Sequence, residues 1–239
     1  MRNENWYDGL VSRDSFQASS VLPALMRKVF VWMTLGLVIT ALTAYGVASS
    51  PALITLIFSS KLTFFGLIIA EVALVMWMTV AVSRMSLTTA TLCFALFSAV
   101  NGATLASVFI VYSMTIITKV FLITAGTFGA MALVGFTTKT DLSFIGRYVI
   151  MALLGLIIAT VVNIFIGSAG MDMLISYAGV IIFVGLTAYD TQRIKQMCLE
   201  APDAGENMQK LALLGALELY LDFINLFLYL LRIFGNKRN

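Results

Sequence analysis

The stretch Ala216–Gly235, "ALELYLDFINLFLYLLRIFG", places two acids inside an apolar run long enough to cross a membrane. At 1.5 Å per helical residue, about 20 residues span the ~30 Å hydrocarbon core of a bilayer. Glu218 and Asp222 are one helical turn apart, and Asn225 continues the same helical face. Because an acid at mid-membrane costs at least ~2.5–3.5 kcal/mol, such residues normally face protein or water. The stretch therefore predicts a central C-terminal helix.

The whole chain is too apolar for a water-soluble protein. Its 239 residues are 60% hydrophobic and 11% charged, with a mean hydropathy of +0.97, whereas soluble domains are about 25% charged. The net charge of +3 is too weak to favour a nucleic-acid partner. The absence of histidine excludes most zinc hydrolases, Ser-His-Asp catalysis and histidine proton relays. We expect an integral membrane protein that is not an enzyme and has no resident cofactor.

Apolar runs bounded by charged residues predict an all-α membrane protein with seven transmembrane helices. The sixth run is closely bracketed by Asp172 and Asp190. We expect a polar N-terminal tail at 1–26, a single seven-helix transmembrane domain at 27–235 and a short C-terminal tail at 236–239. The predicted spans lie at about 29–49, 63–83, 88–112, 117–137, 147–167, 172–191 and 211–233.

The distribution of Lys and Arg predicts the orientation of the chain. Ten of these residues lie on the side of the N-terminus and five on the other side. Because cytoplasmic loops carry an excess of Lys and Arg, the N-terminus is expected in the cytoplasm and the C-terminus outside. The short tails favour a bacterial plasma (inner) membrane over the endoplasmic reticulum.

Four carboxylates in or at the edges of the spans are the candidate functional groups. No Lys or His is expected at mid-membrane to neutralise them, although a buried structural hydrogen bond is the alternative for any one acid. Their oxygens suit a hard cation such as Ca²⁺. With the predicted topology, Arg84 and Asp190 end the second and sixth spans at the inner face, and Asp222 lies deeper. The four acids are Glu71, Asp190, Glu218 and Asp222.

Several motifs in order along the chain resemble the Bax inhibitor-1 family of transmembrane proteins. The resemblance extends from about residue 25 to residue 235. It is carried by "NGATLASVFIVYS" (101–113), "FGAMALVGFTTKTDLS" (128–143), "GLIIATVVNIFI" (155–166), "FVGLTAYDTQRIK" (183–195) and "LYLDFINLFLYLLRIFG" (219–235).

The resemblance implies a seven-helix bundle whose last helix is wrapped by the other six. It also implies a Ca²⁺ leak regulated by pH through two aspartates, which match Asp190 in "AYDTQ" and Asp222 in "LYLDFINLF". An arginine latch of the second helix matches Arg84 within the loosely similar "AVSRMS", and Glu71 matches an acidic position of that helix.

We therefore expect calcium ions to permeate under the control of a proton-sensing pair. Two adjacent carboxylates resist ionising together and can share a proton. In the predicted mechanism Arg84 ties the second helix to this pair, and protonation weakens that tie. Asp190 and Asp222 would make transient Ca²⁺ contacts, and Glu71, Glu218 and Asn225 would line the ion pathway. The lipid bilayer is the other partner, and the sequence identifies no protein partner.

Other functions for the acids stay open. A proton-coupled transporter also uses acids inside a bundle, although the two halves of the chain show no convincing internal repeat. An intramembrane aspartyl protease would pair aspartates on neighbouring helices, one of them in a Tyr-Asp motif such as Tyr189-Asp190. The Pro-Ala-Leu element of those proteases follows the second aspartate, whereas "PAL" here occurs only at 23–25 and 51–53. A membrane scaffold would leave the acids unexplained.

Overall fold

The computed structural model of the chain describes residues 4–200 and 205–235, with the backbone alone described for residues 4–20. Seven of the described helices are long and apolar enough to cross a membrane, as the sequence predicted. Two short elements, α2 (Pro51–Phe58) and the 3-10 helix η1 (Val82–Arg84), connect them. The long helices are α1 (Glu4–Ala48), α3 (Lys61–Ala81), α4 (Leu87–Val111), α5 (Met114–Thr137), α6 (Ser143–Ile166), α7 (Ala169–Leu199) and α8 (Glu206–Phe234).

Serine N-caps fix where most of these helices begin. The side chain of each serine accepts a hydrogen bond from the backbone N–H three residues later, which satisfies a donor that the first helical turn leaves free. Ser86, for example, accepts from the N–H of Thr89 at 3.1 Å and starts α4 at Leu87. The capping serines are Ser50, Ser60, Ser86, Ser113 and Ser168.

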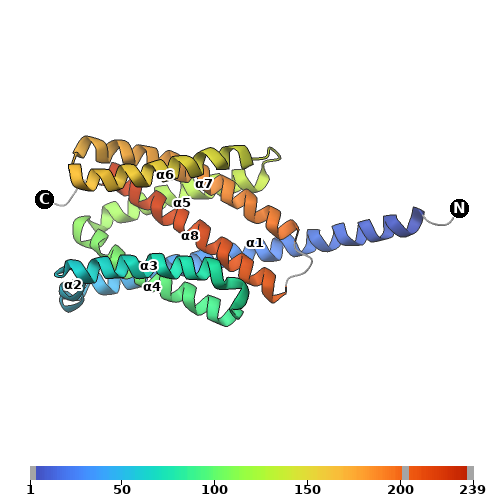
Figure 1. Ribbon diagram of the computed structural model, residues 1–239, viewed down its shortest axis with the longest axis horizontal. Coiled ribbons are helices and arrows are strands. Elements are labelled where there is room, and N and C mark those ends of the chain that lie inside the picture. The colour runs from blue at the N-terminus through green and yellow to red at the C-terminus, as the bar shows by residue number, and fades with distance from the viewer. Residues whose placement is uncertain (1–3, 201–204, 236–239) are drawn as a thin grey trace.

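Helix α8 is the centre of the bundle, as predicted. In its most apolar window 67% of the residues are buried, against at most 33% in any other span. Helices α1, α4, α5 and α7 pack on it, while α3 packs on α4 and α6 packs on α7. Figure 1 shows α8 crossing diagonally between the α3–α4 pair and the α6–α7 pair. The shell around α8 is thus made mainly by four helices, with α3 and α6 outside them, and differs from the complete six-helix wrap that the resemblance implied.

Two glycines allow pairs of these helices to approach closely. A Cβ atom on Gly135 of α5 would overlap the carbonyl oxygen of Ala188 in α7. A Cβ atom on Gly102 of α4 would lie 2.6 Å from the carbonyl oxygen of Thr40 in α1. Lipid chains are as apolar as the helix surfaces, so the hydrophobic effect does not drive helices together inside a membrane. Helices associate there through close packing, which small residues such as glycine allow.

Two helices are longer than the sequence predicted. Helix α1 already begins at Glu4, and Leu25 and Met26 are buried in the core, so the helix runs through the expected N-terminal tail. Helix α7 continues to Leu199, because side chains beyond Asp190 still pack on α8; Ile194 lies against Gly215 there. Asp190 is therefore inside a helix and does not end one. The expected C-terminal tail, 236–239, lies outside the described residues.

Helix α1 begins and helix α8 ends at opposite ends of the bundle (Figure 1). An odd number of spans requires this arrangement. The connections between α3 and α4 and between α5 and α6 lie at the end where α1 enters, and α7 ends and α8 begins there as well. The sequence predicts this end to be cytoplasmic.

Candidate functional site

The carboxyl groups of Asp190 in α7 and Asp222 in α8 lie against each other in the interior of the bundle. The two residues are 8% and 4% exposed, and a side-chain hydrogen bond can join the carboxyl groups when one of them carries a proton. Neighbouring helices thus bring together two acids that are 32 residues apart in the sequence (222 − 190). The geometry allows the pair to share one proton.

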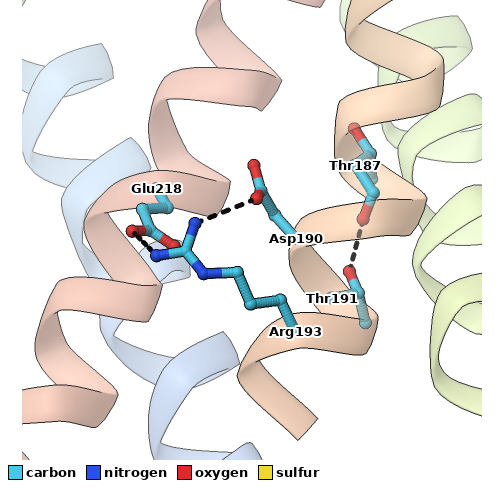
Figure 2. Close-up of polar contacts among 5 residues, drawn as sticks. All are labelled: Thr187, Asp190, Thr191, Arg193 and Glu218. Atoms are coloured by element: carbon cyan, nitrogen blue, oxygen red, sulfur yellow. Dashed lines mark hydrogen bonds and ion pairs between the residues drawn. The ribbon is translucent and has the colours of Figure 1, made fainter. Parts of the chain in front are cut away.

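Arg193 lies one turn after Asp190 and is the cation at this site. Its Nη1 atom is 3.7 Å from Asp190 Oδ1, and its Nη2 atom is 3.1 Å from Glu218 Oε1 in α8. Figure 2 shows the guanidinium group between the two carboxylates. Arg193 thereby joins α7 to α8 across their polar contact. Sequence analysis missed this role, although the spacing of three residues from Asp190 puts Arg193 on the same face of α7.

The site carries more acid than base. The guanidinium of Arg193 contacts Asp190 and Glu218, and Asp222 lies against Asp190. Glu218 Oε2 and Asp222 Oδ2 are buried with no hydrogen-bond partner among the described residues. The hydroxyl group of Thr191 bonds the carbonyl oxygen of Thr187 at 2.6 Å within α7 and so does not serve the acids (Figure 2). Buried carboxylate oxygens without donors favour binding of a proton or a cation.

Arg84 does not contact the aspartate pair in this structure. Its side chain is exposed at the end of η1, and no salt bridge joins it to an acid in the described part of the chain. The predicted latch of Arg84 on the pair is therefore not formed in this structure and stays a prediction. The short 3-10 turn directs Arg84 outward, and the arginine already on α7 occupies the position beside Asp190.

The α3–α4 connection nevertheless binds to α8 through other residues. The Nζ atom of Lys210, a buried residue at the start of α8, donates to the carbonyl oxygen of Met85 at 3.1 Å. Glu206 Oε1 accepts a hydrogen bond from the backbone N–H of Leu87 at 2.9 Å. These two bonds fasten the α3–α4 connection to the start of α8, at least 12 residues before Asp222 (222 − 210), and do not reach the aspartate pair.

Glu71 belongs to a second polar cluster that is separate from the aspartate pair. Its Oε2 atom accepts from Asn101 Nδ2 at 3.0 Å, and its Oε1 atom accepts from the hydroxyl group of Thr104, so α3 is fastened to α4. Asn101 Oδ1 in turn accepts from the Tyr220 hydroxyl group of α8 at 2.9 Å. A half-buried acid bonded in this way has the geometry of a structural hydrogen bond. Its place in an ion pathway stays a prediction.

Tyr220 continues this cluster to α1. Its ring is fully buried between Phe94 and Phe97, and its hydroxyl group lies 2.6 Å from Thr40 Oγ1. Four helices, α1, α3, α4 and α8, are therefore linked by one chain of polar contacts. Such a network helps to specify how the helices pack, provided that all its members are satisfied.

The substitution Tyr220→Phe is expected to destabilise the protein, because it removes the hydroxyl group that donates to Asn101 Oδ1, whereas Thr40 keeps its bond to the carbonyl oxygen of Ser98. A buried group left unsatisfied costs about 1–3 kcal/mol. Reversible unfolding in mixed detergent micelles measures the change in the free energy of unfolding. Tyr177→Phe, at an exposed tyrosine of α7, is the matched control and should change it by less than about 0.5 kcal/mol. Equal free energies of unfolding for the two variants would show that the Tyr220 hydroxyl group contributes no stability.

Asn225 satisfies its own side chain within α8. Its Nδ2 atom donates to the carbonyl oxygen of Leu221 at 2.8 Å, one turn earlier. Its place in an ion pathway stays a prediction.

No three Asp, Glu, Cys or His side chains of the described residues lie close enough together to hold a metal ion. The aspartate pair thus lacks the six to eight oxygens that a resident Ca²⁺ ion takes. A permeating ion needs only transient contacts.

A cavity of about 620 Å³ lies at the opposite end of the bundle. Its lining includes Asp172 and Arg232, and the Asn163 side chain there donates to Asp172 Oδ1 at 2.6 Å. Asp222 and Arg232 are ten residues apart on α8, which corresponds to about 15 Å along the helix axis. The cavity and the aspartate pair are therefore separate sites along α8.

Comparison with known proteins identifies relatives over almost the whole chain. The family described as Bax1-I, "Inhibitor of apoptosis-promoting Bax1", matches residues 22–239. The inner membrane protein YbhL of Escherichia coli is 47% identical over 224 residues, which cover 93% of this chain and 95% of that protein. A protein of Borreliella burgdorferi is 46% identical over 214 residues, covering 90% and 92% of the two chains. A Deinococcus radiodurans protein is 40% identical over 214 residues and 90% of each chain.

Proposed function

We propose that this chain, which belongs to the Bax inhibitor-1 family of membrane proteins, is a pH-sensitive calcium leak of a bacterial inner membrane. Family membership and the seven membrane-spanning helices support the membrane location. The name of the Escherichia coli relative, an inner membrane protein, supports the choice of membrane. The N-terminus lies in the cytoplasm and the C-terminus outside, on the evidence of the Lys and Arg distribution.

The observation that carries the proposal is the excess of acid at the centre of the α7–α8 contact. Asp190, Glu218 and Asp222 share one nearby cation, Arg193, and two of their oxygens are buried without a donor. A hard divalent cation is attracted to such oxygens, and one that is incompletely coordinated can leave again. Calcium is therefore the permeating substrate, and it is not a resident cofactor.

Arg193 supplies the proposed gate. Its guanidinium group holds Asp190 of α7 and Glu218 of α8 together, so the closed state gains two charge-assisted contacts. A proton that binds to the aspartate pair removes negative charge beside Arg193 and weakens this tie. Moving a population from mostly closed to mostly open takes about 5.5 kcal/mol, of which one coupled proton supplies only a part. Acid on the cytoplasmic side therefore opens the leak.

Calcium flux into liposomes that contain the purified full chain tests the proposal. A trapped Ca²⁺ dye should report protein-dependent flux that rises as the pH on both sides is lowered from about 8 to about 6. Equal pH on both sides, with a proton ionophore present, removes any proton gradient. Persistent flux under that condition indicates a leak. Flux that stops indicates the proton-coupled transporter, and a rate equal to that of protein-free liposomes would overturn the proposal.

Replacing Arg193 by Gln is expected to raise calcium flux at alkaline pH toward its acid level, because the tie between α7 and α8 is then absent at every pH. A gain of about tenfold at about pH 8 corresponds to ~1.4 kcal/mol, a reasonable value for one partly exposed charge-assisted hydrogen bond and one longer ion pair. Arg147→Gln, at an exposed arginine of α6, is the matched control and should behave as the unmodified chain does. A loss of flux in the Arg193 variant would instead make Arg193 part of the pathway.

We further propose that the chain has no enzymatic activity. The adjacency of Asp190 and Asp222 is compatible with an aspartyl protease dyad, but the Pro-Ala-Leu element is missing after Asp222. Cleavage of a helical reporter peptide that an aspartyl transition-state mimic blocks would contradict this conclusion.

A further inference from the structure

A groove between α1 and α5 faces the surrounding lipid. It has a volume of about 520 Å³. Its described lining is apolar except for Arg27, which lies four residues after Pro23. The lining includes Phe30 and Met33 of α1 and Phe128, Gly129 and Phe136 of α5, and the groove follows α1 from Pro23 to Met33, or about 15 Å of helix. We propose that this groove binds an anionic phospholipid, with an acyl chain along the apolar walls and the phosphate group at Arg27.

The space along α5 is open at Gly129. A Cβ atom built on this residue meets no atom within 4 Å, although Phe128 and Ala132 beside it are buried. Leu133, on the rim, is 64% exposed and faces the membrane. An unfilled apolar groove at the membrane-facing surface of a helical bundle is solvated by lipid chains, because nothing else in the bilayer can fill it.

Arg27, the charged residue of the described lining, favours a negatively charged lipid headgroup. Arg27 is exposed, and no acidic side chain of the described residues pairs with it. Lys195 is a second cation beside a lining residue, since its Nζ atom bonds the carbonyl oxygen of Phe136 at 2.7 Å and lies 5.1 Å from the ring centroid of that residue. Two cations and no acid favour a phosphate that has no compensating ammonium group. Arg27 lies six residues after the start of the candidate span Val21–Ala48 of α1, where a long side chain can reach the headgroups.

The inner end of the groove leads toward the aspartate pair. The Phe128 ring packs edge-on against Phe223, with centroids 5.5 Å apart, and Phe223 follows Asp222 in α8. A chain in the groove would therefore press on the helix that carries Asp222. Any lipid dependence of calcium flux rests on the proposed function, whereas lipid binding does not and is measured without flux.

Native mass spectrometry of the full chain in detergent tests the binding. The protein is incubated separately with phosphatidylglycerol and with phosphatidylethanolamine, and the retained lipid is counted. We expect about fivefold stronger retention of phosphatidylglycerol, from about one favourable cation–phosphate contact. Equal retention of both lipids would overturn the proposal. So would loss of phosphatidylglycerol on addition of inorganic phosphate alone, because the site would then bind an anion without the chain.

Three variants separate the parts of the site. Gly129→Leu fills the groove and should abolish retention of both lipids. Gly126→Leu is the matched control, because Gly126 lies on the same helix with similarly open space but outside the groove. This control should leave lipid retention unchanged. Arg27→Gln alters only an exposed side chain and should remove the preference for phosphatidylglycerol. Unchanged lipid retention in Gly129→Leu would overturn the proposal. So would an unchanged preference for phosphatidylglycerol in Arg27→Gln, and this second test does not depend on whether Gly129→Leu folds.

Discussion

In calcium-loaded liposomes, the substitution Asp222→Asn is expected to abolish the dependence of flux on pH. Asparagine keeps the size of the side chain and cannot share a proton with Asp190. A single coupled proton changes a population ratio by at most about tenfold per pH unit. We therefore expect the ratio of fluxes at about pH 6 and about pH 8 to fall from about tenfold or more to about one. The dye assay described above measures both rates for each variant.

Asp141→Asn is the matched control, because this acid lies outside the membrane spans between α5 and α6. Its carboxylate accepts a hydrogen bond from the backbone N–H of Ser143 at 2.9 Å, and the bonds from Ser143 hold the pKa of Asp141 below its ordinary value. Asp141 therefore stays ionised at neutral pH and should not contribute to gating. An unchanged pH response in Asp222→Asn, or a response lost equally in both variants, would remove the aspartate pair from the mechanism.

The fold could be predicted from the sequence because apolar length alone identifies membrane spans, whereas the exact helix starts needed finer signals. Charges were used to bound the spans, and the fifth and sixth spans were expected to begin at 147 and 172. The structure starts α6 at Ser143 and α7 at Ala169. Ser168 caps α7, and a serine in a loop is too common to be identified as a cap without the structure.

The acids of the site were predictable and their cation was not. An acid in an apolar run stands out because burying it is costly, so Asp190, Glu218 and Asp222 were identifiable from the sequence alone. Arg193 was assigned to a polar loop because α7 was expected to end near Asp190. The continuation of α7 to Leu199 depends on packing against α8, which the sequence of one helix does not reveal.

The substitution Gly135→Ala is expected to destabilise the bundle by about 3 kcal/mol, although alanine is the better helix former. The new Cβ atom would overlap the carbonyl oxygen of Ala188, a backbone atom that cannot rotate away, so α5 and α7 must separate. Overpacking that forces backbone shifts costs about 1–3 kcal/mol and sometimes more, and helix propensity returns at most about 1 kcal/mol. Reversible unfolding in mixed micelles measures the free energy of unfolding.

The same exchange elsewhere on α5 should have the opposite sign, which makes the comparison decisive. A Cβ atom on Gly126 meets no atom within 4 Å, so Gly126→Ala gains helix propensity without a clash and should be neutral or stabilising by up to about 1 kcal/mol. Because both variants add one methyl group to one helix, differences in lipid exposure or in the unfolded state largely cancel. If Gly135→Ala were as stable as Gly126→Ala, the close α5–α7 contact beside Asp190 would not exist in the membrane.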